Sequence, residues 1–137
     1  MTDDLAQWLG EQLDVDAAHA VAAAEEAPGA EWRYDGQYVV AVAERDMVAV
    51  GSQDFMDPKV GEHIAAHDPA RVLREIDAKR QMLTLHAATG GHECSTRDER
   101  GDIDHCTWVM ESEACPTLRL LALPYADRPG YREEWRP

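Results

Sequence analysis

Basic residues are scarce in this chain. Its 137 residues include 13 Lys and Arg against 27 Asp and Glu, which gives a formal net charge of −14. Binding to nucleic-acid phosphates depends on cationic contacts, so this balance argues against direct nucleic-acid binding. It argues equally against docking on anionic membranes, which attract clusters of Lys and Arg. We therefore expect an acidic globular protein whose partner is neither nucleic acid nor a membrane.

Long hydrophobic runs are also missing. The chain opens with acids at Asp3 and Asp4, where a secretory signal would carry Lys or Arg. The most apolar stretch near the start, residues 17–24, is rich in Ala and is interrupted by His19. It is far shorter than the ~20 residues that span a bilayer. We therefore expect a cytoplasmic protein without a membrane span.

Common catalytic motifs are absent as well. The Gly90-Gly91 pair follows a predicted helix instead of preceding one, so it indicates a helix end and not a phosphate-binding loop. There is no Gly-x-Ser-x-Gly pattern of the kind that presents a nucleophilic serine. The sequence therefore predicts no catalytic residue.

The patterns that are present predict one α+β domain over residues 1–137. Leu5, Leu9 and Leu13 recur at four-residue steps, which is typical of an amphipathic helix. Asp35-Gly36 lies between β-rich runs and favours a hairpin turn. Asp68-Pro69 is a strong helix start, because Asp caps helices and Pro suits the first helical position. The expected order is an N-terminal helix (1–27), a small three-stranded antiparallel sheet (31–53), helices ending in a long central one (60–88), a polar loop (90–115), and a C-terminal helix with a tail (116–137).

Cysteine is rare but concentrated. The chain has three Cys residues, and all lie in or at the end of the polar loop, at Cys94, Cys106 and Cys115. Together with His86 they make a Cys3His set, which is a standard ligand set for structural Zn²⁺. A long polar loop gains order if one metal clamps it between two helix ends, because metal binding then contributes folding free energy. The sequence predicts such a zinc site, with His105 or His92 as alternatives for the fourth ligand.

Three stretches resemble a family of small actinobacterial and phage-borne proteins known as a domain of unknown function. The stretches are HIAAHDPARVLREIDAKR at 63–80, CPTLRLLALPYAD at 115–127 and YREEW at 131–135. The resemblance implies a His after the long helix, a close Cys pair in the loop, and a Cys before Pro-Thr-Leu-Arg. His86, Cys94 and Cys115 match those places. The family's second loop Cys would be expected near Arg97, and this chain has no Cys there. Cys106 is its substitute as a ligand, and His105 stays an alternative.

Three functions remain open. The first is a zinc-stabilised module that binds another protein through its aromatic residues Trp108, Tyr125, Tyr131 and Trp135. The second is an acidic mimic that occupies the nucleic-acid-binding surface of a partner, which the charge of −14 allows. The third is a small zinc hydrolase, which would need an open metal position with three protein ligands.

Overall fold

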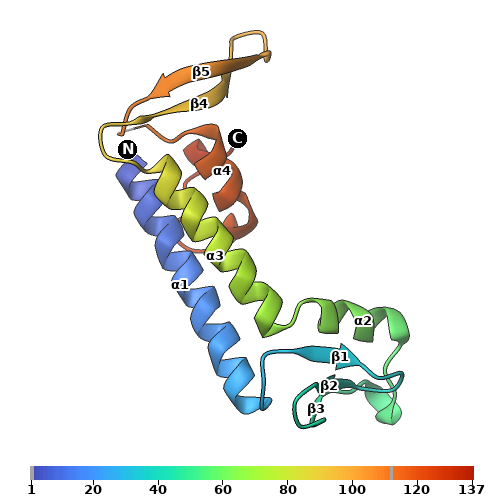
Figure 1. The fold of residues 1–137 in the computed structure, drawn as a ribbon. Helices are drawn as coiled ribbons and strands as arrows, with labels where there is room; N and C mark the ends of the chain where they lie inside the picture. Colours follow the sequence, from blue (N-terminus) through green and yellow to red (C-terminus); the bar gives the residue numbers. More distant parts are fainter. Residues whose placement is uncertain (1, 112) are drawn as a thin grey trace. The chain divides into compact units, whose positions relative to one another are not determined.

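The computed structural model has the α+β organisation that the sequence predicts (Figure 1). It describes residues 2–111 and 113–137, and the side chains of residues 2–4 and 106 lie outside that description. Contacts divide the chain into a terminal unit, residues 1–14 with 78–137, and a middle unit, residues 15–77. Within the described ranges, no helix combines the length and the apolar character needed to cross a membrane. The helices are α1 (Thr2–Glu26), α2 (Pro58–Ala66), α3 (Pro69–His86) and α4 (Pro116–Ala122), and the strands are β1 (Trp32–Tyr34), β2 (Val39–Ala41), β3 (Met47–Ala49), β4 (His92–Arg97) and β5 (Ile103–Val109).

The middle unit contains the predicted three-stranded antiparallel sheet, in the order β1-β2-β3. The first turn forms at Asp35-Gly36 as the sequence predicts, because Gly36 adopts a positive φ of 103° that suits only Gly well. The Asp35 carboxylate accepts hydrogen bonds from the backbone N–H groups of Gln37 and Tyr38, at 2.9 and 2.8 Å. All three residues of β2 are buried, so the central strand forms the core of this sheet.

Helix α2 packs against β1 and β2 and covers the small sheet. Gly61 lies on the contacting side of α2, where a Cβ atom would collide with the ring of Tyr34. The Tyr34 hydroxyl lies 2.8 Å from the carbonyl oxygen of Gly36 and 3.0 Å from that of Met56, and its single proton is shared between these two acceptors. Tyr34 therefore joins the β1–β2 turn to the segment that leads into α2.

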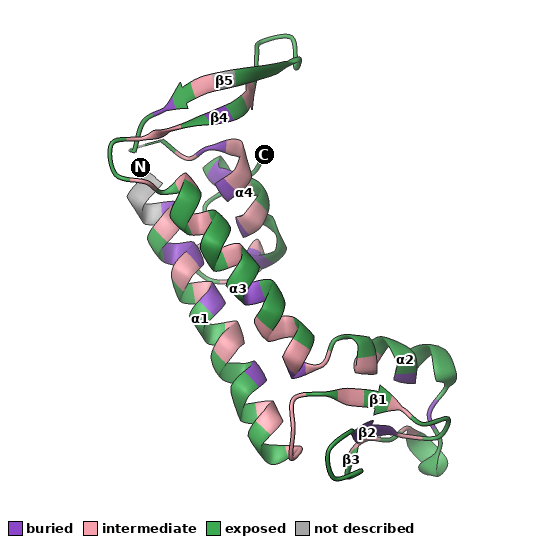
Figure 2. Cartoon of the chain, in the orientation of Figure 1, coloured by how far each residue is buried: buried purple, intermediate pink, exposed green. Residues whose placement is uncertain are grey.

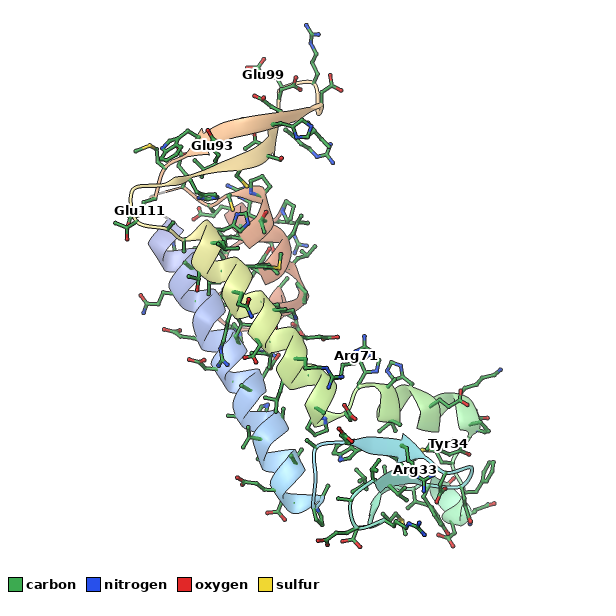
Figure 3. The ribbon with its side chains drawn as sticks, viewed as in Figure 1. Arg33, Tyr34, Arg71, Glu93, Glu99 and Glu111 are labelled. Atoms are coloured by element: carbon green, nitrogen blue, oxygen red, sulfur yellow. The ribbon has the colours of Figure 1, made fainter. Side chains whose placement is uncertain are left out.

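Asp68 separates α2 from α3 and caps the longer helix. Its Oδ1 accepts the Arg71 backbone N–H at 2.8 Å, while its Oδ2 accepts the Trp32 backbone N–H at 3.0 Å. The side chain of Arg71, in the first turn of α3 (Figure 3), donates to the carbonyl oxygen of Ala66 at the end of α2. These bonds satisfy backbone groups that helix ends leave unpaired. They also bind the start of α3 to β1.

The terminal unit is built around the start of α1. Leu5, Leu9 and Leu13 are fully buried, and Figure 2 shows buried positions recurring along one side of the helix. Trp8 packs against the C-terminal tail, where its Nε1 donates to the Pro129 carbonyl at 3.1 Å. Its ring centroid lies 5.7 Å from that of Tyr131 and 5.5 Å from that of Trp135. The aromatic tail is therefore part of the core of this unit.

The segment predicted as a polar loop, residues 90–115, instead contains a β-hairpin. Strands β4 and β5 pair antiparallel, with His92 opposite Val109 and Cys94 opposite Thr107. The turn between them is held by Asp98, whose Oδ1 accepts the backbone N–H groups of Arg100 and Asp102. The loop prediction was wrong because this strand pair buries few side chains, so the apolar alternation that marks a strand is weak here.

Candidate metal centre

Three elements of the terminal unit bring four His and Cys side chains together. His86 is the last residue of α3, His92 and Cys94 lie on β4, and Cys115 immediately precedes α4. One ligand atom from each lies within 4.8 Å of every other, which is close enough for one metal ion to bind all four. Among the described residues, this is the cluster that could hold a metal. We call it the Cys2His2 cluster.

Three short distances in the Cys2His2 cluster start from Nδ1 of His86 and are compatible with shared binding of one metal ion. Nδ1 of His86 lies 3.1 Å from Nε2 of His92, 3.7 Å from Sγ of Cys94 and 3.5 Å from Sγ of Cys115. In a tetrahedral site with Zn–S bonds of about 2.3 Å and Zn–N bonds of about 2.0 Å, neighbouring ligand atoms lie roughly 3.3 to 3.8 Å apart. The distances from His86 therefore fall close to the edges of such a tetrahedron.

Local structure sets the position of each ligand. Successive side chains of a strand point to opposite faces, so His92 and Cys94, two residues apart on β4, share one face. Gly91 precedes them with a φ of 96°, and a Cβ there would collide with the backbone of Val109. The Cys115 backbone is extended, and Pro116 follows at the first position of α4. Gly91 and the start of α4 thus position the side chains of the cluster on the two sides of the open end of the hairpin.

Both sulfur atoms have further polar contacts. The backbone N–H of Leu118 donates to Sγ of Cys115 at 3.5 Å, and Oγ1 of Thr117 lies 3.9 Å from Sγ of Cys94. The two cysteines are buried, with exposed fractions of 8% for Cys94 and 1% for Cys115. Neither is in a disulfide. Groups of this kind orient metal ligands and stabilise thiolate charge in zinc sites.

Burial also shifts the acid–base behaviour of the cluster. Burial lowers the pKa of His86, and the neighbouring His92 lowers it further. Burial raises the pKa of the Cys115 thiol, a direction that the charge of Cys94 reinforces and the N–H of Leu118 opposes. A lowered pKa favours the neutral imidazole of His86, which is the form that coordinates a metal.

The structure brings together three of the four residues predicted as ligands, His86, Cys94 and Cys115. The fourth member of the described cluster is His92, which the sequence predicts as an alternative fourth ligand. The other alternative, His105, is exposed and lies 3.3 Å from the Ser95 hydroxyl through its Nδ1. Cys106 belongs to β5, and its side chain lies outside the described residues.

His92 could have been found from the sequence through its spacing. A His and a Cys at i and i+2 point to the same face only if the segment is a strand. In an irregular loop the same spacing carries no geometric information, and the segment was predicted as a loop. Predicting that His92 and Cys94 lie on one face therefore requires that residues 92–97 be recognised as a strand.

The four aromatic residues predicted to contact a partner differ in exposure. Trp108, on β5 opposite Glu93, is 56% exposed, whereas Tyr125 and Trp135 are only 4% and 3% exposed. Tyr131 is half-buried and packs edge-on against Trp135, with ring centroids 5.8 Å apart. Tyr125 and Trp135 are therefore core residues of the terminal unit, and their rings are not available on its surface for a partner.

Comparisons with known proteins give one result. The model of a family of unknown function, DUF6221, matches residues 2–137. Searches of curated proteins and of solved structures gave no match. The chain therefore belongs to DUF6221, a membership that assigns no activity to it.

Proposed function

We propose that this member of DUF6221 binds one structural Zn²⁺ through His86, His92, Cys94 and Cys115, and serves as a non-catalytic module that binds another protein. The observation that supports the metal site is the mutual distance of four ligand atoms, all within 4.8 Å. A set of two sulfur and two nitrogen ligands favours Zn²⁺ over the hard cations Ca²⁺ and Mg²⁺, which prefer oxygen ligands.

The ligand count supports a structural role. A catalytic zinc site keeps a position open for water or substrate, whereas a structural site is closed by four protein ligands. The Cys2His2 cluster offers four, and two of them are buried cysteines. This arrangement disfavours the hydrolase considered above.

A structural zinc would suit the terminal unit because its β4–β5 hairpin buries little. Three large apolar side chains on or next to β5 are more than half exposed: Ile103, Trp108 and Met110. A two-stranded hairpin is marginally stable by itself in water. Zinc would join the hairpin to the ends of α3 and α4 and would contribute its binding free energy to folding.

The metal site is tested by the metal content of the purified protein, measured by elemental analysis together with native mass spectrometry. The expected result is one zinc per chain. Cys94→Ser and His92→Gln should each reduce zinc content to well under half, because both remove a ligand. Cys106→Ser and His105→Gln are the matched controls and should retain full zinc content.

Two outcomes would contradict the proposal. One is a protein purified under metal-replete conditions that contains no zinc and gains none on titration. The other is loss of zinc in Cys106→Ser with full retention in His92→Gln, which would restore the Cys3His set. Cobalt substitution separates the two sets independently, because the intensity of the thiolate-to-cobalt absorption rises with the number of thiolate ligands.

A further inference from the structure

The middle unit carries an open groove that the metal site does not involve. The groove has a volume of about 640 Å³ and is lined by the segment between β3 and α2, with Val50 and Phe55, and by Val60 in the first turn of α2. These three side chains are 41%, 55% and 52% exposed. Single exposed apolar residues are ordinary, but several large ones around one groove mark an interaction site.

The groove is preformed by local contacts. Gly51 lies so close to the Phe55 backbone that a Cβ atom would collide with the Phe55 carbonyl. Met56 is 5% exposed beneath the groove, and its carbonyl accepts the Tyr34 hydroxyl. The Gln37 side chain donates to the Asp54 carbonyl at 3.2 Å. A surface held in this way loses little conformational entropy when it binds a partner.

One carboxylate lines the groove and others lie near it. Asp57 lines it, and Asp54 lies in the same segment. Burial raises the pKa of Tyr34, and the negative charges of Asp35, Asp57 and Glu62 raise it further. Burial likewise raises the pKa of Tyr38, with Asp54 and Asp35 adding to the shift. Asp35 therefore acts on both tyrosines, Tyr34 on β1 (Figure 3) and Tyr38 before β2, while each of the other three carboxylates acts on one of them.

The sequence of this region agrees with a negative local field. Residues 31–62 contain seven acidic residues, Glu31, Asp35, Glu44, Asp46, Asp54, Asp57 and Glu62, against three basic ones, Arg33, Arg45 and Lys59. A complementary partner must therefore bring positive charge as well as an apolar side chain for the groove.

We propose that this groove binds a basic segment of a partner protein, in which Lys or Arg residues flank at least one large apolar side chain. The inference rests on the proposed protein-binding function and supplies its site. The apolar side chain enters between Val50, Phe55 and Val60, and the flanking cations face Asp54, Asp57 and Glu62. A second copy of this chain fits poorly, because a symmetric contact would place the same carboxylates against each other.

The test uses the zinc-loaded full chain and a random dodecapeptide library displayed on phage. Parallel selections are made on the intact protein, on Phe55→Ser and on Ile103→Ser. Phe55 and Ile103 are 55% and 57% exposed, so the two substitutions remove similar apolar surface, one in the groove and one on β5 of the terminal unit. We expect the intact protein and Ile103→Ser to enrich peptides with a net positive charge and an apolar anchor, and Phe55→Ser to enrich none of them.

A second pair of variants tests the charge. Two double variants each remove two exposed acidic charges. The first, Asp54→Asn/Glu62→Gln, changes residues near the groove. The second, Glu93→Gln/Glu99→Gln, changes residues on the β4–β5 hairpin, with Glu99 at its tip (Figure 3). Asn is suitable at position 54 because it tolerates the positive φ of 61° found there. A peptide selected on the intact protein should bind the first variant about tenfold more weakly, because two of the carboxylates that face its cations are removed. Its affinity for the second should be unchanged.

Three results would overturn the proposal. The first is equal enrichment on the intact protein and Phe55→Ser, and the second is enrichment of neutral or acidic peptides. The third is a dimer in size-exclusion chromatography with light scattering that Phe55→Ser converts to a monomer, since the groove would then hold a second copy. Zinc content is measured on the same samples, so a failed metal site is recognised separately from a failed groove.

Discussion

Sγ of Cys115 lies 3.5 Å from Nδ1 of His86, although the two residues are 29 positions apart in the chain. Cys115 precedes α4 and His86 ends α3, so a metal bound by both would join the two helix ends across the β4–β5 hairpin. The stability of the terminal unit should therefore depend on metal.

A strong chelator should lower the unfolding temperature of the intact protein. At a free zinc concentration about a thousand times the dissociation constant, binding stabilises the folded state by about 4 kcal/mol. For a chain of this size, that corresponds to a shift of roughly 10 °C or more. Calorimetry with and without chelator measures it, and added zinc should restore the transition. Cys94→Ser should not respond to the chelator, and an intact protein that also fails to respond would argue against a structural metal.

Trp135→Ala should destabilise the protein strongly. Trp135 is 3% exposed and packs on Trp8 and Tyr131, so truncation leaves a cavity that costs about 3–5 kcal/mol. Trp108→Ala is the matched control, because Trp108 is 56% exposed. It should change the free energy of unfolding by about 0.5 kcal/mol or less. Urea denaturation of both variants checks this, and equal effects would place the tail outside the core.

Gly130→Ala should destabilise the terminal unit more than Gly101→Ala does. The two glycines have similar φ values, 89° and 84°, so both substitutions introduce a left-handed non-glycine residue. That change costs about 1–2 kcal/mol. Only at Gly130 does the added Cβ approach a side chain, with Trp8 Nε1 2.7 Å away. Denaturation midpoints compare the two, and a smaller effect at Gly130 would show that the tail shifts to accommodate the methyl group.

Asp68→Ala should destabilise the middle unit by about 1–3 kcal/mol. The substitution removes the cap of α3 and also leaves the Trp32 backbone N–H without its acceptor. Asp68→Asn keeps one acceptor oxygen and should lose less. Hydrogen exchange at Trp32 and Arg71 reports on each bond directly. Unchanged protection of both amides in Asp68→Ala would refute the capping role.

Asp35 should give the middle unit a pH dependence in the acid range. Hydrogen bonds from the Tyr38 and Gln37 backbone N–H groups lower the pKa of Asp35 in the folded protein. Since the folded pKa lies below the unfolded one, this stabilisation is complete above the unfolded pKa and is lost as pH falls through the folded pKa. The difference in stability between the intact protein and Asp35→Asn should therefore shrink as pH falls below about 4. A difference that is constant with pH would contradict the role of the ionised carboxylate.

Much of the fold could be predicted because its signals are local. The leucine spacing of α1, the Asp35-Gly36 turn and the Asp68-Pro69 start of α3 each depend on residues within a few positions of one another. The hairpin at 90–115 could not be predicted in the same way. Its strands alternate polar residues such as Glu93 and Ser95 with the buried Cys94, so no run of β-branched or aromatic residues marks β4.

Local patterns were enough to predict the main helices, the first sheet, and His86, Cys94 and Cys115 as candidate ligands, because capping, periodicity and residue chemistry operate over short distances. Three features depend on the folded chain: His92 lies in the cluster, Tyr125 and Trp135 are buried, and Val50, Phe55 and Val60 line one groove. These outcomes depend on strand register and on which faces meet. Contacts between distant segments set both, and no local pattern in this chain records them.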